Sequence, residues 1–170
     1  MMTAFRCLQV KGGPSPGEIP QMRQGLAAWC ATGAGVFRPH YLTLLSAVYG
    51  KAGLVEQEWT ALTEALEIVK STGERWWEAE IHRIKGELLL RRASPTEEVE
   101  DCFRQALAMA QHQQAKSLEL RAAMSLARLW QQQGKRAEAR ELLAPIYGWF
   151  TEGFDTADLQ EAKALLDALA

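Results

Sequence analysis

Few side chains in this sequence stand at spacings that would build a catalytic or metal-binding centre. The three histidines are scattered at His40, His82 and His112, and none belongs to an H-E-x-x-H motif or to a cysteine–histidine zinc spacing. His82 follows Glu78 by four residues, a spacing typical of a polar pair on a helix surface. We therefore expect neither a metal site nor a bound cofactor.

The carboxylates offer the next possible chemistry. Four glutamates fall within one short segment, at Glu74, Glu78, Glu80 and Glu87, but basic residues are interleaved with them. Carboxylate pairs act as general acid and base where an apolar pocket separates their pKa values, whereas an interleaved segment indicates a solvated, ion-paired helix face. The G-x-S-x-G and G-x-x-x-x-G-K-[ST] motifs, which activate a serine or cradle a phosphate, are also missing. The sequence predicts that the chain is not an enzyme.

The composition narrows the class of protein further. The 170 residues carry 19 Lys and Arg against 21 Asp and Glu, a net charge of −2, which argues against a nucleic-acid binder that neutralises phosphates. No apolar run approaches a membrane span, and the first residues do not look like a signal peptide. The odd, scattered cysteines Cys7, Cys30 and Cys102 fit a reducing compartment. We expect a cytoplasmic protein with no membrane or nucleic-acid partner.

Chain breaks recur with a period near 40 residues. One class of break falls at GGPSPG (12–17), Gly53, Ala93-Ser94-Pro95 and Gly134. A second class alternates with it, at 32–39, 71–74, 112–116 and 151–156. The segments Ser15-Pro16-Gly17-Glu18 and Ser94-Pro95-Thr96-Glu97 both match a capping box with proline at the first helical position. Two breaks per period, with helical residues between them, predict a helix-turn-helix repeat.

The predicted architecture is all-α: a right-handed α–α superhelix of about nine antiparallel helices. The good helix formers Ala, Leu, Glu, Gln and Arg dominate, and no segment alternates as a half-buried strand would. We place the helices near 3–11, 16–31, 39–52, 55–71, 74–92, 96–112, 115–133, 136–150 and 156–169. Such hairpins bury their apolar faces only by stacking on neighbours. Residues 1–170 are therefore predicted to form a single domain, with 156–169 as its C-terminal capping helix and 1–17 fitting the repeat poorly.

The helix pattern resembles tetratricopeptide repeats, although its period is longer than usual. The matching residues are Leu42, Leu45, Ser46, Tyr49, Gly53, Leu62 and Ala65 in the first repeat, Gly86, Leu89, Val99, Phe103 and Ala106 in the second, and Leu126, Ala127, Trp130, Gly134, Ala139 and Leu143 in the third. Residues 38–53, 73–90 and 115–169 also resemble the C-terminal tetratricopeptide region of predicted bacterial ATPases and nucleotidyl cyclase-type signalling proteins. That resemblance implies a sensor or scaffold module rather than the ATPase itself.

The tetratricopeptide resemblance also implies a binding face, because the first helix of each repeat lines the concave side in that family. Carried onto this chain, the groove positions are His40, Thr43, Ala47, Lys51, Glu80, Arg83, Glu87, Arg91, Arg121, Met124, Arg128 and Gln132. Four arginines and a lysine among them suggest an anionic or polar partner segment. The alternative is that they are solvated helix faces with local Glu partners. Thr43 and Ala47 do not reproduce the carboxylate clamp of chaperone-binding members.

Two further features remain open at this level. Trp76 and Trp77 are adjacent, so one helix face cannot hold both, and Trp76 either packs at a turn or is exposed as an interaction contact. The apolar side of helix 16–31 (Ile19, Met22, Leu26, Trp29) lacks an evident cover, so either the N-terminal segment folds over it or another subunit does, and our hypothesis is a homodimer through the N-terminal end. The leading function is a non-enzymatic scaffold that binds a protein or peptide in its concave groove. The alternative is a small-molecule effector sensor in a signalling ATPase or cyclase system.

Overall fold

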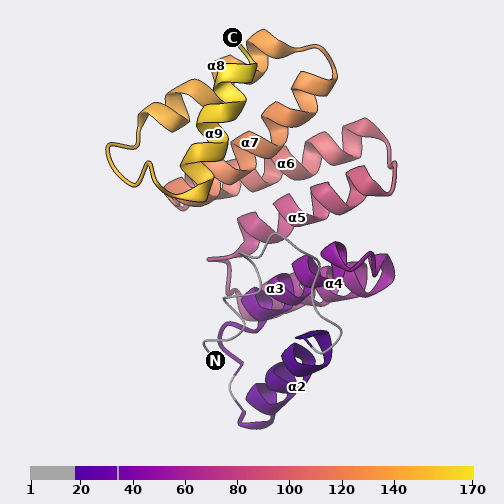
Figure 1. Cartoon of the computed structure of the whole chain (residues 1–170). Coiled ribbons are helices and arrows are strands. Elements are labelled where there is room, and N and C mark those ends of the chain that lie inside the picture. Colours follow the sequence, from indigo (N-terminus) through magenta and orange to yellow (C-terminus); the bar gives the residue numbers. More distant parts are fainter. Residues whose placement is uncertain (1–17, 34) are drawn as a thin grey trace.

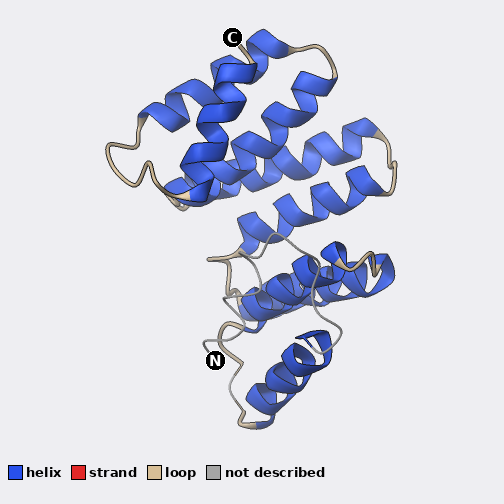
Figure 2. Ribbon diagram, in the orientation of Figure 1, coloured by secondary structure: helices blue, strands red, loops and turns tan. Residues whose placement is uncertain are grey.

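The computed structural model describes residues 18–33 and 35–170, and this part of the chain contains eight α-helices and no strand (Figures 1 and 2). The predicted helix 3–11 lies outside the described residues. The helices are α2 (Glu18–Ala31), α3 (Arg38–Lys51), α4 (Val55–Thr72), α5 (Glu78–Arg91), α6 (Thr96–His112), α7 (Lys116–Gln132), α8 (Arg136–Gly148) and α9 (Ala157–Ala168).

Consecutive helices pack as hairpins that stack along one direction (Figure 1). The closest packing is within the pairs α3–α4, α5–α6 and α7–α8. Each odd-numbered helix also contacts the next odd-numbered helix, whereas successive even-numbered helices make no comparable contact within the described residues. The odd-numbered helices therefore line the inside of a curved stack, and the even-numbered helices lie on its outside.

A residue in the left-handed region closes the turn after each helix from α2 to α8, and these residues set the repeat. They recur about every 20 positions, at Gly33, Gly53, Gly73, Ala93, Gln114, Gly134 and Gly153. Glycine adopts this conformation without the steric cost that a Cβ brings, which is why the chain breaks were visible in the sequence. The predicted period near 40 is thus confirmed as two left-handed turns per hairpin.

The start of α6 differs from the predicted capping box. Pro95, rather than Ser94, is the N-cap residue, and no side chain caps the helix. The Ser94 N–H instead donates to the Leu89 carbonyl at 3.0 Å, which closes the end of α5, and the Pro95 carbonyl accepts from Glu98 and Val99. The prediction failed because Ser94 serves the preceding helix. The matching segment at 15–18 lies almost entirely outside the described residues.

Helix α5 begins at Glu78, four residues later than predicted, because residues 74–77 form a bridge between two loops. The Glu74 carboxylate accepts hydrogen bonds from the Phe37 N–H at 2.7 Å and from the Trp76 Nε1–H at 3.0 Å. Phe37 itself holds a left-handed conformation, with φ of 68°. The α2–α3 and α4–α5 loops are thereby tied together at one edge of the stack.

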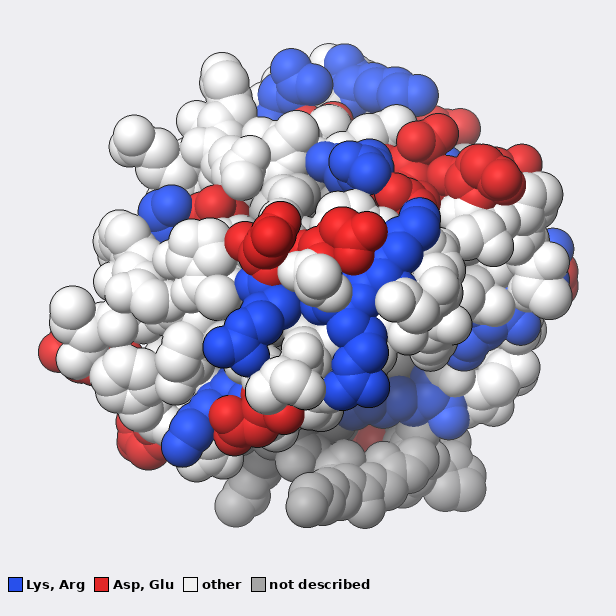
Figure 3. Space-filling model, turned by 90° about the horizontal axis from the view of Figure 1, so that it is seen from above, with Lys and Arg blue, Asp and Glu red and all other residues white. Residues whose placement is uncertain are grey.

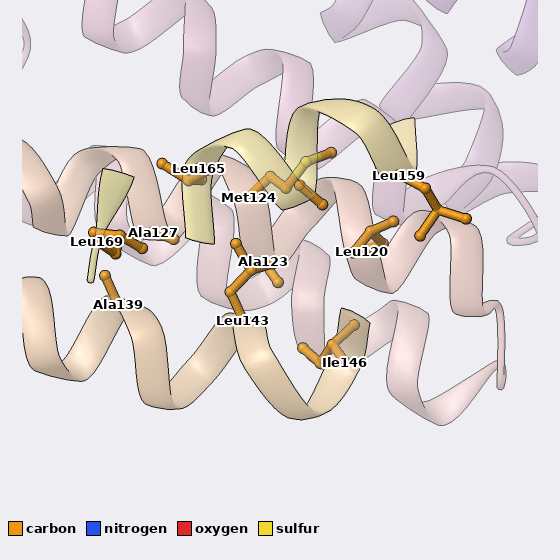
Figure 4. Packing of buried hydrophobic residues seen from close by; sticks show 11 residues of the cluster. Leu120, Ala123, Met124, Ala127, Ala139, Leu143, Ile146, Leu159, Leu165 and Leu169 are labelled. Atoms are coloured by element: carbon orange, nitrogen blue, oxygen red, sulfur yellow. The ribbon is translucent and has the colours of Figure 1, made fainter. Parts of the chain in front are cut away.

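Small residues let the helices approach closely in the core. In the C-terminal cluster, Ala123 and Ala127 of α7 face Ala139 and Leu143 of α8, with α9 covering them (Figure 4). At the α5–α6 seam, a Cβ placed on Gly86 would lie 2.5 Å from a ring carbon of Phe103, which is itself fully buried. Close approach at these positions follows from side-chain size, as expected for stacked hairpins.

Candidate functional site

The inside of the curve is the candidate site. The structure buries some of the predicted groove residues and leaves others at the surface. Thr43, Glu80 and Met124 are buried and do not line a surface. The Thr43 hydroxyl donates to the Pro39 carbonyl at 2.6 Å, and Met124 packs in the cluster that joins α7 to α8 and α9. The prediction that these three side chains line a surface is wrong. Neighbouring odd-numbered helices cover more of this face than the pattern along a single helix reveals.

Arg83 is the centre of an internal ion-pair network on α5. Its guanidinium donates to both Glu80 oxygens, at 2.9 and 2.8 Å, and also pairs with Glu87. Burial alone would raise the pKa of Glu80, but the charge of Arg83 and its hydrogen bonds outweigh it and lower that pKa. Burial lowers the pKa of Arg83, and Glu80 and Glu87 raise it well above its usual value. Both groups are therefore held charged.

The same network ties successive odd-numbered helices together. Ser125 of α7 donates to Glu87 of α5 at 3.3 Å. Arg121 of α7 lies 3.7 Å from Glu80 and 2.7 Å from Asp158 of α9, and Arg128 of α7 lies 2.9 Å from Glu161 of α9. Arg121 and Arg128 are thus paired with carboxylates of neighbouring helices rather than with local partners on α7.

Charges of both signs interleave on the exposed surface as well. Figure 3, seen from above the C-terminal end, shows Lys and Arg side chains beside Asp and Glu side chains. Arg91 reaches from α5 to the fully buried Glu58 of α4. Lys51 and Gln132 are exposed or partly exposed, and the side chain of Arg128 is 43% exposed. On the inner face, Arg121 and Arg128 of α7 lie beside the carboxylates Asp158 and Glu161 of α9.

His40 belongs to an aromatic cluster that the sequence only hinted at through the Trp76-Trp77 pair. Its ring centroid lies 4.5 Å from that of Trp77 and 5.3 Å from that of Trp76, and Phe37 contacts Trp76 edge-on at 5.4 Å. Burial lowers the pKa of His40, and the charge of Glu80 raises it by a smaller amount. Trp76 both packs at the turn and remains 40% exposed, so the two readings of this residue were not exclusive.

The N-terminal end is covered better than the sequence suggested. Ile19, Met22 and Leu26 of α2 are half-buried against the cluster formed by Leu45, Tyr49 and Ala61. The Trp29 ring packs edge-on against Tyr41 of α3, with centroids 6.1 Å apart. Helix α3 therefore covers part of the apolar side of α2, and the homodimer stays a prediction.

No helix in residues 18–33 and 35–170 is long and apolar enough to cross a bilayer. Over the same residues, no group of three or more His, Cys, Asp or Glu side chains is placed to hold a metal ion.

Comparison with known proteins identifies the fold. No protein-family model matches the chain. No curated protein sequence matches it either. Among solved structures, it is similar to a putative kinesin light chain from Podosopora anserina with nearly identical TPR-like repeats, at a TM-score of 0.65 and 18% identity, covering 99% of this chain and 82% of that one. A point-substituted form of that protein gives a TM-score of 0.66 at 17% identity over the same shares of the two chains.

These similarities define a class of fold, the TPR-like α–α superhelix, and confirm the predicted fold class. At this level of identity the likeness concerns the fold alone.

Proposed function

We propose that the chain is a non-catalytic protein-interaction scaffold that binds a partner segment on its concave face. The observation that carries the proposal is that some charged side chains of that face are buried in ion pairs and others are exposed. The Arg83–Glu80 pair lies within α5 and is linked to α7 through Arg121, whereas Lys51 of α3 and Arg128 and Gln132 of α7 extend toward solvent.

The partner segment should carry both charges, because the exposed ion pairs can exchange partners. Arg128 and Glu161 have side chains 43% and 60% exposed, and a pair of this kind contributes only about 0–1 kcal/mol to stability. A carboxylate from a partner can replace Glu161 beside Arg128, and a basic side chain can then pair with the released Glu161. Electrostatic matching of this type supplies specificity and orientation.

Selection from a library of random linear peptides tests the proposal without a known partner. Peptides selected by the wild-type chain should lose affinity for Lys51→Glu and Arg128→Glu, because each reversal repels the carboxylate that the wild type binds. The matched control is Arg140→Glu, which reverses an exposed charge on α8, an outer helix. Equal affinity of the peptides for all four proteins would refute binding on the concave face.

We further infer, from the resemblance of residues 115–169, that this protein-binding scaffold is a region of a cytoplasmic signalling protein. An effector-sensing role is the competing function, and the cleft of about 560 Å³ beside α2 is the observation that favours it. Thermal-shift screening separates the two: metabolites should leave the unfolding midpoint unchanged under the scaffold hypothesis, and the selected peptides should raise it.

A further inference from the structure

Tryptophans bridge two of the boundaries between successive hairpins. Trp59 of α4 packs against the cluster that joins α3 and α4 to α5 and against the cluster that joins α5 and α6 to α7, and Lys85 and Arg92 lie over its ring at 5.8 and 5.3 Å. Trp130 of α7 likewise packs against the clusters on both sides of the next boundary, with Arg104 over its ring at 5.3 Å. At each boundary an indole and a covering cation fill the space between hairpins.

The first boundary, between α2 and the α3–α4 hairpin, is instead an open cleft. Its volume is about 560 Å³, which is within the range of ligand pockets. The largely buried side chains of Leu42, Leu45 and Tyr49 of α3 lie at its base, and the walls supplied by α2 and α4 include the carboxylates Glu56 and Glu64. No tryptophan lines this cleft, since Trp29 of α2 packs against Tyr41 instead.

Two other cationic side chains, Arg23 and Arg38, line this cleft. Arg23 of α2 lines it, is exposed, and has no carboxylate partner within residues 18–33 and 35–170. Arg38 of α3 also lines it and pairs through one terminal nitrogen with Glu64. The Nε of Arg38 is buried and has no hydrogen-bond partner in the described structure. A guanidinium attracts the face of an aromatic ring, most strongly that of an indole.

We propose that the α2–α4 cleft is a docking site for an aromatic anchor side chain, by preference a tryptophan, of a partner protein segment. The side chain of the occupant would fill the space at the first boundary, as Trp59 and Trp130 fill the space at the next two boundaries. A buried aromatic anchor in a pocket is the residue type that contributes most at protein interfaces. This site lies between even-numbered helices, on the outside of the curve, so it goes beyond the proposed concave surface and shares only the premise of protein binding.

Binding of 5-fluoroindole, followed by 19F NMR line broadening on the full chain, tests the site. Ala27→Trp places an indole in the cleft from α2, because Ala27 is exposed and lines it. Ala28→Trp is the matched control, because Ala28 is exposed on the same helix and does not line the cleft. We expect saturable broadening with the wild type and Ala28→Trp, and its loss with Ala27→Trp. Circular dichroism establishes that both variants remain folded.

Competition defines the chemistry of the occupant. N-acetyl-tryptophanamide should displace 5-fluoroindole, and N-acetyl-leucinamide should not. The proposal is overturned by absence of broadening with the wild type, by equal broadening with Ala27→Trp, or by equal competition from the leucine derivative. It is also overturned if Ala27→Trp, and not Ala28→Trp, converts a dimer to a monomer in sedimentation velocity, because the occupant is then a second copy. Lys51→Glu and Arg128→Glu should leave this binding unchanged, which separates its failure from that of the concave surface.

Discussion

Replacing Gly86 with alanine tests the close packing of α5 on α6 most directly. The added Cβ would lie 2.5 and 2.8 Å from two ring carbons of Phe103 and 3.2 Å from the Cβ of Cys102. Favourable contact between carbon atoms requires about 3.5–4.0 Å, so the ring must retreat by about 1 Å. The Phe103 side chain is only 1% exposed, so its ring can move only by displacing other core side chains.

The expected magnitude follows from two opposing effects. Overpacking a filled core costs about 1–3 kcal/mol, and the contact here is severe enough to belong at the upper end. Alanine in a helix interior recovers about 1 kcal/mol relative to glycine. Gly86→Ala should therefore lower the free energy of unfolding by about 2 kcal/mol.

Urea denaturation followed by circular dichroism measures this change as a lower midpoint at constant slope. Gly25→Ala is the matched control, because Gly25 lies inside α2 and a Cβ there meets nothing within 4 Å. That variant should be as stable as the wild type or more so. In a double-mutant cycle, Phe103→Leu should reduce the cost of Gly86→Ala. A Gly86→Ala variant at least as stable as the wild type would refute the packing described for this seam.

Three further expectations concern turns, buried charge and pH. Ala93→Gly should raise the free energy of unfolding by about 1 kcal/mol in a urea titration, because Ala93 holds a left-handed φ of 53° that glycine adopts without strain. Arg91→Ala should destabilise the chain by about 1–3 kcal/mol, since it leaves the fully buried Glu58 without its cation, and Glu58→Leu should relieve part of that loss. His40 and His82 both have a pKa lowered from 6.5, chiefly by burial, so the unfolded chain binds more protons. The contribution of these two neutral side chains to stability is present above pH 6.5 and is lost as pH falls through their lowered pKa values. Replacing both histidines with Asn should therefore flatten the dependence of the unfolding midpoint on pH between about 7 and 5. An unchanged slope would contradict this assignment.

The repeat and the helix bounds were predictable because local chemistry determines them. Gly53, Gly73 and Gly134 adopt left-handed conformations that the sequence reveals directly. Ala93 and Gln114 adopt the same conformation without glycine, and the period, rather than the residue type, locates those two turns. The late start of α5 was missed because the hydrogen bonds of Glu74 join residues 37 positions apart.

The inner face was less predictable because it depends on how one hairpin rests on the next. The pattern along α7 does not reveal that Asp158 and Glu161 of α9 lie beside Arg121 and Arg128. The relation between the two helices is fixed by side-chain packing in the cluster between them, which no local periodicity encodes. The sequence therefore indicated which residues share a helix face, and the structure determined which of them reach solvent.

The ion pairs between successive odd-numbered helices have a mechanical consequence. Arg121 pairs with Glu80 on one side and with Asp158 on the other, so these ion pairs link α5, α7 and α9 along the inside of the curve. Because both arginine and aspartate side chains are about one-third exposed, dissolved salt weakens the links. The ion pairs between the helices therefore weaken as ionic strength rises. A partner that contacts both ends of the molecule would be bound more tightly at low ionic strength than at high ionic strength.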